Sequence, residues 1–467
     1  MDKLLLDELD RLKNTDSKTI AESQSQTFVG LVDFHYNNNA RYRRMMDLHG
    51  VSPKHIKSSS DITRLPIVTS KDITDDPIDE FHSVPEHEIA RFLQTSGSTG
   101  KCKRIPVTNQ EKEGIFVQTA VMNFLAGVKG YYKTNGGDDA GGKIYSLFPC
   151  GPWPSQFFSL NACSLIGPTV TAGIHLPFDW HVEELLTMKP KYLITYPSFL
   201  SFFWKKMSPK MDISSLGLER IVLAGEPFSE TDRKRYERLF KTSVSDLYGC
   251  AEIYGAASEC DHLRESGWMH WYSPNLIMEV LDKETLEPID EPQKEGIMVV
   301  TNLLKRAIPI VRYRMGDLIS KGEPNGSCGC GLNLPLISRI KGRYDDTFQY
   351  GGANIYPDQI HSAAELAGFE DKYQLTLTRK SDENDGVFSD AMVIYVEKEV
   401  ANEREKREME SAFSRKFNEA LSNSSLEYSQ IVNIIEFCPP AQIELVEPGR
   451  LFNESKTKLK KIIDLRR

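Results

Sequence analysis

The amino-acid sequence predicts an α/β protein with a large N-terminal domain and a small α+β C-terminal domain. Four short apolar runs lie between helical stretches, at residues 143–149, 192–197, 220–224 and 297–303. Strands that alternate with helices at this spacing favour an α/β core. Near the C-terminus, a strand-like run at 391–396 precedes a charged helical stretch, and this pattern predicts a separate α+β domain.

The boundary between the two domains is expected near 344–346, where a polar, charged stretch follows Gly342 and Arg343. The expected domains are therefore 1–344 and 345–467. The second domain is predicted to contain an amphipathic helix, because apolar residues recur there at every fourth position and share one helical face. These residues are Met409, Phe413, Phe417 and Leu421.

The composition narrows the range of partners. The chain has 467 residues, with 57 Lys and Arg against 66 Asp and Glu, which gives a net charge of −9. Nucleic acids and anionic membranes attract basic patches, so neither is expected as the main partner. No segment approaches the ~20 apolar residues of a membrane span. Leu5, Leu9 and Leu12 share one helical face, which predicts an amphipathic surface helix rather than a secretory signal. We expect a cytoplasmic protein and leave a homodimer open.

The stretch 94–103, which reads QTSGSTGKCK, has the composition of a phosphate-binding loop. Glycines allow the backbone to approach a ligand closely, and successive N–H groups with Ser and Thr hydroxyls can surround a polyphosphate. Lys103 can neutralise its charge. The stretch is no P-loop, because Gly97 and Gly100 are too close together and Cys102 follows Lys101 where that motif requires Ser or Thr. A flexible Ser/Gly loop is the alternative.

This loop resembles the T-S-G-[ST]-T-G-x-x-K signature of the adenylate-forming superfamily, which includes acyl-CoA synthetases and adenylation domains. Four further motifs follow in that superfamily's order. They are GEP at 225–227, similar to its adenine loop; YGCAE at 248–252, similar to Y-G-x-[TS]-E; YRMGD at 313–317, similar to Y-R-T-G-D; and GRYDD at 342–346, similar to the G-R-x-D-D hinge.

Within the superfamily, the chain most resembles phenylacetate–CoA ligases, and the resemblance covers nearly its whole length. The segment 41–71, the GANIYP motif at 352–357 and the tail 458–466 carry it. It implies a large, multi-layer N-terminal domain that binds ATP and the acid, and a mobile C-terminal lid domain. It also implies that a carboxylic acid and ATP form an acyl-adenylate, whose acyl group then passes to CoA.

The resemblance assigns a role to each nucleotide-binding residue. Tyr248 would stack on adenine, Asp317 would accept hydrogen bonds from the ribose hydroxyls, and Arg343 would contact ribose or phosphate. Without the resemblance, these residues would be read as a core tyrosine, a turn and a surface ion pair. The implied cofactor-binding residues are Thr95, Ser96, Gly97, Ser98, Thr99, Gly100, Lys103, Gly225, Glu226, Pro227, Tyr248, Gly249, Asp317 and Arg343.

Two residues are implied as catalytic. Glu252 would hold Mg²⁺ against the phosphates, since Mg²⁺ favours one or two carboxylates together with phosphate oxygens. Lys458 would bridge the attacking carboxylate and the α-phosphate, and Asp345 would be the hinge of the C-terminal domain. Ala251 departs from the superfamily pattern, because a Thr or Ser is expected there. That departure keeps open a nucleotide-binding regulatory protein without turnover.

A structural zinc site is expected from a C-x-H…C-x-C pattern. Cys260, His262, Cys328 and Cys330 would supply three thiolates and an imidazole, which is a closed tetrahedral ligand set. Relatives of phenylacetate–CoA ligases carry similar cysteines. His270 is the alternative fourth ligand, and unliganded thiols are the alternative to zinc.

The substrate is expected to be a flat aromatic acid. Trp153, Phe157, Tyr196 and Ala224 are the candidate pocket walls, although aromatic runs are more often part of a core. The leading hypothesis is an aryl acid–CoA ligase that uses ATP, Mg²⁺ and CoA. The first alternative transfers the acyl group to a carrier-protein thiol or an amine.

Overall fold

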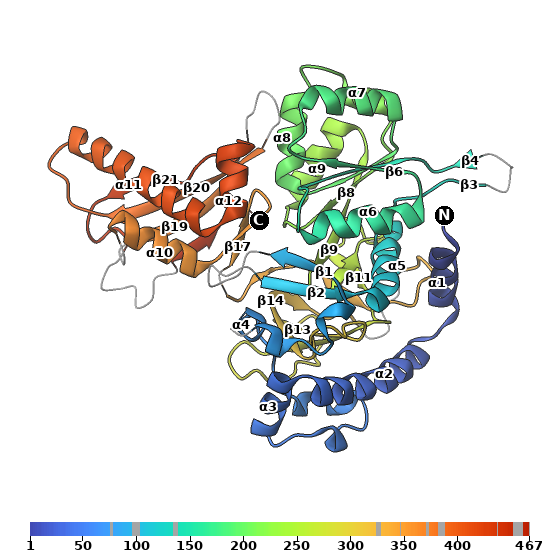
Figure 1. Ribbon diagram of the computed structural model, residues 1–467. Coiled ribbons are helices and arrows are strands. Elements are labelled where there is room, and N and C mark those ends of the chain that lie inside the picture. The colour runs from blue at the N-terminus through green and yellow to red at the C-terminus, as the bar shows by residue number, and fades with distance from the viewer. Residues whose placement is uncertain are drawn as a thin grey trace.

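The computed structural model describes residues 1–74, 78–95, 103–133, 139–323, 328–345, 347–369, 373–381, 388–436, 438–451 and 461–466. Figure 1 shows a large body of helices and sheets with a smaller unit, drawn in orange and red, at its side. The smaller unit is formed by the C-terminal part of the chain. The predicted fold class, a large α/β domain with a small α+β domain, is confirmed.

The N-terminal domain is built around a sheet of eight strands, in which five parallel strands continue into three antiparallel ones. The predicted runs at 143–149, 192–197 and 220–224 form three adjacent parallel strands, which are largely buried. In spatial order the strands are β6 (Thr169–Gly173), β5 (Ile144–Phe148), β7 (Tyr192–Thr195), β8 (Arg220–Ala224), β9 (Ser243–Cys250), β10 (Tyr254–Ser258), β11 (Trp268–Trp271) and β15 (Leu336–Ser338).

Helices of the N-terminal domain cover this sheet and extend beyond it. The helix α5 begins at a capping box, in which Thr108 and Glu111 each accept a hydrogen bond from the other's backbone N–H. Within the described part of the chain, every helix is too short or too polar to cross a lipid bilayer. The helices are α1 (Lys3–Asn14), α2 (Ser17–Asn38), α3 (Ala40–Leu48), α4 (Ser70–Thr74), α5 (Asn109–Leu125), α6 (Pro154–Ile166), α7 (Phe178–Met188), α8 (Pro197–Met207) and α9 (Glu230–Phe240).

The helix α1 confirms the amphipathic pattern, since Leu5, Leu9 and Leu12 are buried on one face.

Smaller sheets complete the domain. The predicted strand at 297–303 is β13, in an antiparallel sheet of β12 (Leu276–Leu281), β13 (Glu295–Asn302), β14 (Tyr313–Ser320) and β16 (Gly342–Arg343). Two hairpins are β1 (Ile89–Thr95) with β2 (Lys103–Thr108), and β3 (Tyr132–Lys133) with β4 (Asp139–Ala140).

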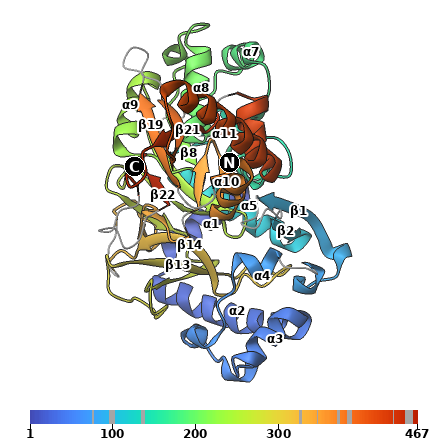
Figure 2. The same cartoon turned by 90° about the vertical axis from the view of Figure 1, so that its left-hand side faces the viewer.

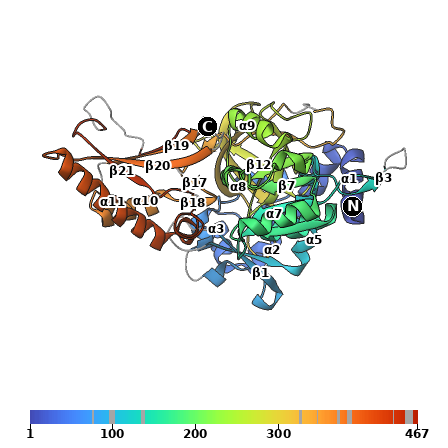
Figure 3. The same cartoon turned by 90° about the horizontal axis from the view of Figure 1, so that it is seen from above.

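The C-terminal domain confirms the predicted strand at 391–396 as part of β20 and the predicted amphipathic helix as α11. Phe417 and Leu421 of this helix are buried. Figures 2 and 3 show β19 and β20 running toward α8 and α9 of the N-terminal domain. The elements are β17 (Phe348–Tyr350), β18 (Ala353–Ile355), α10 (Pro357–Ala367), β19 (Tyr373–Ser381), β20 (Phe388–Glu397), α11 (Glu403–Ser424), α12 (Leu426–Ser429), β21 (Gln442–Val446) and β22 (Ile462–Asp464).

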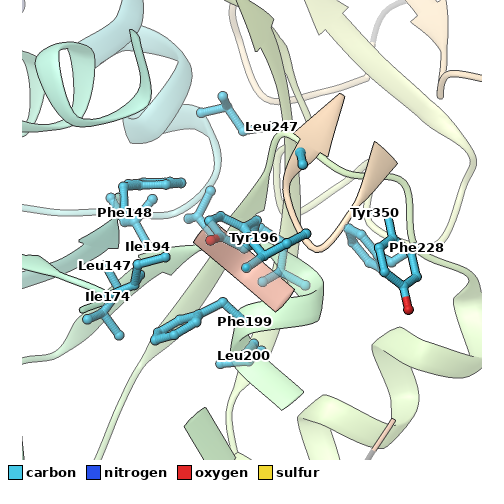
Figure 4. Packing of buried hydrophobic residues seen from close by; sticks show 14 of the residues in the cluster. Leu147, Phe148, Ile174, Ile194, Tyr196, Phe199, Leu200, Phe228, Leu247 and Tyr350 are labelled. Atoms are coloured by element: carbon cyan, nitrogen blue, oxygen red, sulfur yellow. The ribbon is translucent and has the colours of Figure 1, made fainter. Parts of the chain in front are cut away.

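The two domains share one hydrophobic cluster. Phe148, the last residue of β5, and Tyr196, directly after β7, belong to the same buried cluster as Tyr350 of the C-terminal domain (Figure 4). Burial of these aromatic side chains stabilises the observed arrangement of the domains. The boundary itself, between 344 and 345, stays a prediction.

Candidate active site

A cavity of about 530 Å³ lies at the carboxyl ends of the parallel strands β5, β7, β8 and β9, between the two domains. Ligands of open α/β sheets bind at this end of the strands, because the connecting loops there leave a crevice. Its lining includes Ala224 at the end of β8, Tyr248 near the end of β9 and Gly352 of the C-terminal domain. The cavity is therefore formed jointly by both domains.

The cavity brings together the predicted nucleotide-binding residues that the structure describes. These residues come from five separate motifs, and all of them line the same space. The predicted residues Ser96, Gly97, Ser98, Thr99 and Gly100, and the predicted catalytic Lys458, lie outside the described residues. The predicted residues that line the cavity are Thr95, Lys103, Gly225, Glu226, Pro227, Tyr248, Gly249, Glu252, Asp317, Arg343 and Asp345.

Lys103 and Glu252 form a buried ion pair in the wall of the cavity. The hydroxyl group of Tyr313 donates to Glu252 Oε1 at 3.0 Å and accepts from Lys103 Nζ at 3.3 Å. Burial raises the pKa of Glu252 and is the largest single effect. The charge of Lys103, together with hydrogen bonds from Lys103, Cys250 and Tyr313, outweighs burial and lowers the pKa to about 2. Both side chains are therefore charged at neutral pH.

A second polar cluster joins Tyr248, Asp317 and Arg343. The Tyr248 hydroxyl donates to Asp317 Oδ2 at 2.6 Å, and Arg343 Nη1 donates to Asp317 Oδ1 at 3.1 Å. Burial and the Asp317 carboxylate raise the pKa of Tyr248 well above its ordinary value, so the hydroxyl remains a donor. Arg343 also binds Asp345 through two hydrogen bonds, of 3.0 and 2.8 Å.

Aromatic side chains also line the cavity. Trp153, Tyr196 and Ala224 line it as the sequence analysis expected. Phe157 does not. It packs edge-on against Phe116, with ring centroids 5.3 Å apart, and its neighbour Phe158 lines the cavity instead.

The sequence analysis assigned no role to one residue that the fold brings to the cavity. Tyr313 was known only as the first residue of a motif, yet it contacts both members of the Lys103–Glu252 pair. Phe148, the last residue of β5, also lines the cavity, and the order of the strands places it in the wall.

A compact cluster of three cysteines and one histidine lies at the antiparallel end of the central sheet. Cys260 follows β10, His270 is in β11, and Cys328 and Cys330 precede β15. Their ligand atoms all lie within 4.8 Å of one another; the sulfur atoms of Cys260 and Cys328 are 3.5 Å apart. Ligands of a tetrahedral zinc ion lie about 3.5–3.8 Å from one another, so the cluster fits such an ion.

The histidine of this cluster corrects the sequence analysis. His262 is exposed and is not among the clustered residues, whereas His270 is buried. His270 Nε2 lies 2.9 Å from the sulfur of Cys328 and 3.3 Å from that of Cys330. The alternation of side chains along β11 points His270 toward the cysteines, which spacing in the sequence could not reveal.

Aromatic walls and a set of nucleotide-binding motifs around one cavity are typical of an adenylate-forming enzyme. The chain belongs to the AMP-binding enzyme family, whose family model matches residues 17–302. The family model of the AMP-binding enzyme C-terminal domain matches residues 352–466.

Curated relatives confirm the resemblance to phenylacetate–CoA ligases. The chain is 26% identical to the phenylacetate–coenzyme A ligase of Thermus thermophilus over 356 residues, which are 76% of each chain. It is 25% identical to the Escherichia coli enzyme of the same name over 378 residues, or 80% of this chain and 82% of the relative.

Among solved structures, the fold is similar to that of a 2-hydroxyisobutyryl-CoA ligase in complex with 2-HIB-AMP and CoA in the thioesterification state. The TM-score is 0.77 at 20% identity, covering 97% of this chain and 91% of that one. With the same ligase in its postadenylation state, the TM-score is 0.63, covering 98% and 92%. Both comparisons are with the same ligase, so the difference in TM-score reflects the arrangement of the domains. The arrangement in this chain is more similar to that of the first state than to that of the second.

Proposed function

We propose that this protein activates a carboxylic acid with ATP and transfers the acyl group to CoA. One observation carries the proposal: a single cavity joins the Tyr248–Asp317–Arg343 cluster to an aromatic pocket and to the Gly351–Gly352 turn of the C-terminal domain. A nucleotide, an acid and an acceptor can meet there. The names of the curated relatives support the same assignment.

The order of groups along the cavity suggests how the first step proceeds. The ring of Tyr248 would bind adenine, and Asp317 would accept hydrogen bonds from the ribose, as its contacts with a hydroxyl and a guanidinium suggest. A carboxylate oxygen of the acid attacks the α-phosphorus, and pyrophosphate leaves. Binding and orientation supply much of the acceleration in reactions of this kind.

Charge on the phosphates would be balanced by Lys103, Arg343 and the predicted Lys458. Glu252 would hold Mg²⁺, which supplies charge neutralisation at the phosphate oxygens. The Glu252 carboxylate is ionised, which suits that role. In the second step, the thiolate of CoA attacks the acyl carbonyl carbon, and AMP leaves with the bonding electron pair.

The acid is proposed to be aromatic. Phe148, Trp153, Phe158 and Tyr196 line the cavity, and the rings of Phe148 and Tyr196 lie with their centroids 6.1 Å apart and their planes tilted by 38°. Aromatic walls of this kind favour a planar ligand through offset and edge contacts.

We also propose zinc as a structural ion for the Cys260–His270–Cys328–Cys330 cluster, because its four donors leave no position open for water.

Two alternatives differ from this proposal in a measurable way. A carrier-protein thiol or an amine would replace CoA in the second step. A regulatory nucleotide binder would carry out neither step. Ala251, which is buried and lines the cavity where the superfamily motif has Thr or Ser, keeps that alternative open.

Pyrophosphate exchange and CoA consumption test the proposal. The protein is incubated with ATP, labelled pyrophosphate and a panel of aryl, aliphatic and amino acids. We expect exchange that depends on an aryl acid, and formation of the acyl-CoA when CoA is added. Exchange without acyl-CoA formation would favour the other acceptors, and no exchange with any acid would contradict the proposal.

A further inference from the structure

A line of buried charges crosses from one domain to the other. Arg379 of β19 donates from Nη1 to Asp232 Oδ2, at 2.7 Å, in the first turn of α9. The two side chains are 7% and 3% exposed. Within the C-terminal domain, Arg379 Nε donates to Asp390 Oδ1 at 2.7 Å, and Arg466 Nη1 donates to Asp390 Oδ2 at 2.7 Å. Positive and negative groups thus alternate along the line.

The Asp232–Arg379 pair is the link of this line that joins the domains, and each member also has a partner in its own domain. Asp232 Oδ2 accepts a hydrogen bond of 2.9 Å from the backbone N–H of Ser229. Arg379 holds Asp390 with both Nε and Nη2. A buried charge that loses its only partner is strongly destabilising. If the pair separates, Arg379 keeps Asp390 as a counter-charge and Asp232 keeps its hydrogen bond from Ser229, so the pair suits a contact that forms and breaks.

The pair forms in the domain arrangement that is more similar to a thioesterification state than to a postadenylation state. In this arrangement, Gly352 packs closely on Tyr196: a Cβ atom at Gly352 would lie 3.1 Å from the Tyr196 ring. We propose that the Asp232–Arg379 ion pair holds the C-terminal domain in the orientation for acyl transfer and so positions the Gly351–Gly352 turn beside the acid pocket. This inference rests on the proposed function.

Asp232→Asn tests the role of the pair in the two half-reactions, because the amide oxygen can still cap α9 while the charge is lost. With phenylacetate and ATP as probes, we expect pyrophosphate exchange within about twofold of wild type. Transfer from supplied phenylacetyl-adenylate to CoA should slow at least about tenfold, since the transfer-competent orientation becomes less populated. Arg379→Gln should have the same effect, and the double variant should add little to it.

Glu230→Gln is the matched control. Glu230 lies in the same helical turn as Asp232, but it pairs with Arg233 of its own helix. Both half-reactions of this variant should match wild type. A purely structural role for Asp232 would lower both half-reactions of Asp232→Asn equally, and that result would overturn the proposal.

The orientation itself can be measured without any turnover. Spin-labelled unnatural amino acids replace Lys234 of α9 and Arg407 of α11, which are both exposed, and electron–electron distances are recorded. We expect one main distance in wild type and a second, displaced population in Asp232→Asn. An unchanged distribution in Asp232→Asn would refute the role of the ion pair, even if no acid supports exchange and the proposed function fails.

Discussion

Lys103 and Glu252 both stabilise the fold and line the candidate active site. The carboxylate and the ammonium group are buried against each other, and Tyr313 hydrogen-bonds to both. Removing one member of such a pair leaves the other charge buried without a counter-charge. In the proposed reaction, the same two charges would face the phosphates of ATP and Mg²⁺.

Glu252→Gln is therefore expected to destabilise the protein by about 3–5 kcal/mol at pH 7. The pKa of Glu252 is lowered to about 2 in the folded chain, from an ordinary value of 4.5. A lowered carboxyl pKa contributes stability above the unfolded-state pKa, and that contribution is lost as pH falls toward the folded-state pKa. The difference in melting temperature between wild type and variant should thus narrow as the pH falls from about 4.5 toward about 2.

The measurement is thermal unfolding across this pH range, with Glu219→Gln as the control. Glu219 pairs with Lys191 at the surface, where both side chains are about half exposed. Exposed pairs contribute at most about 1 kcal/mol, so the control should unfold close to wild type. Equal melting temperatures for Glu252→Gln and Glu219→Gln at pH 7 would show that the buried ion pair stabilises the protein no more than the exposed pair does.

At the scale of elements, the cysteine–histidine cluster connects strands that are distant in sequence. It joins the loop after β10 and the strand β11 to the segment before β15, at the end of the central sheet. A metal ion there would fix the position of β15, which is the edge strand of that sheet. Bound metal of this kind adds its binding energy to folding.

Cys328→Ser is expected to release one zinc ion per chain and to lower the melting temperature, because a structural zinc ion needs all four ligands. His270→Ala should behave in the same way. His262→Ala is the matched control and should keep the metal, since His262 is exposed and outside the cluster. Elemental analysis of the purified proteins measures the zinc content per chain. Wild-type protein without stoichiometric zinc would contradict the proposal.

At the scale of the whole molecule, the C-terminal domain is expected to take two orientations relative to the N-terminal domain. The structure has one of them, in which β19 reaches α9 and the Gly351–Gly352 turn lines the cavity. Movement between orientations is usually concentrated in a few residues at a domain boundary. Asp345, which is held by two hydrogen bonds from Arg343, is the residue that we propose for this hinge.

Lys458→Ala is expected to abolish pyrophosphate exchange and to leave acyl transfer from supplied acyl-adenylate within about twofold of wild type. The physical reason is that the lysine charge is needed only where negative charge develops on the α-phosphate. Lys456→Ala is the control, two residues away in the same basic tail. Loss of exchange in Lys456→Ala alone would show that the register of the tail is wrong.

The sequence by itself determined the class of this protein. Five motifs in a fixed order, together with short apolar runs between helices, were enough to predict the α/β core, the C-terminal domain and the nucleotide-binding residues that line one cavity. Local signals suffice for the α/β core and the C-terminal domain, because strand and helix periodicity are properties of contiguous residues. The nucleotide-binding residues were implied by the resemblance of the motifs to the adenylate-forming superfamily.

Only the tertiary structure decided which side chains meet. Phe157 and Phe158 are neighbours on α6, and successive helical residues point about 100° apart, so helix packing determined that Phe158 lines the cavity. His270 rather than His262 joins the cysteines because β11 places it beside them. The Asp232–Arg379 contact depends on how two domains are oriented. The two residues are 147 positions apart in the sequence, and no local sequence pattern predicts a contact between residues so far apart.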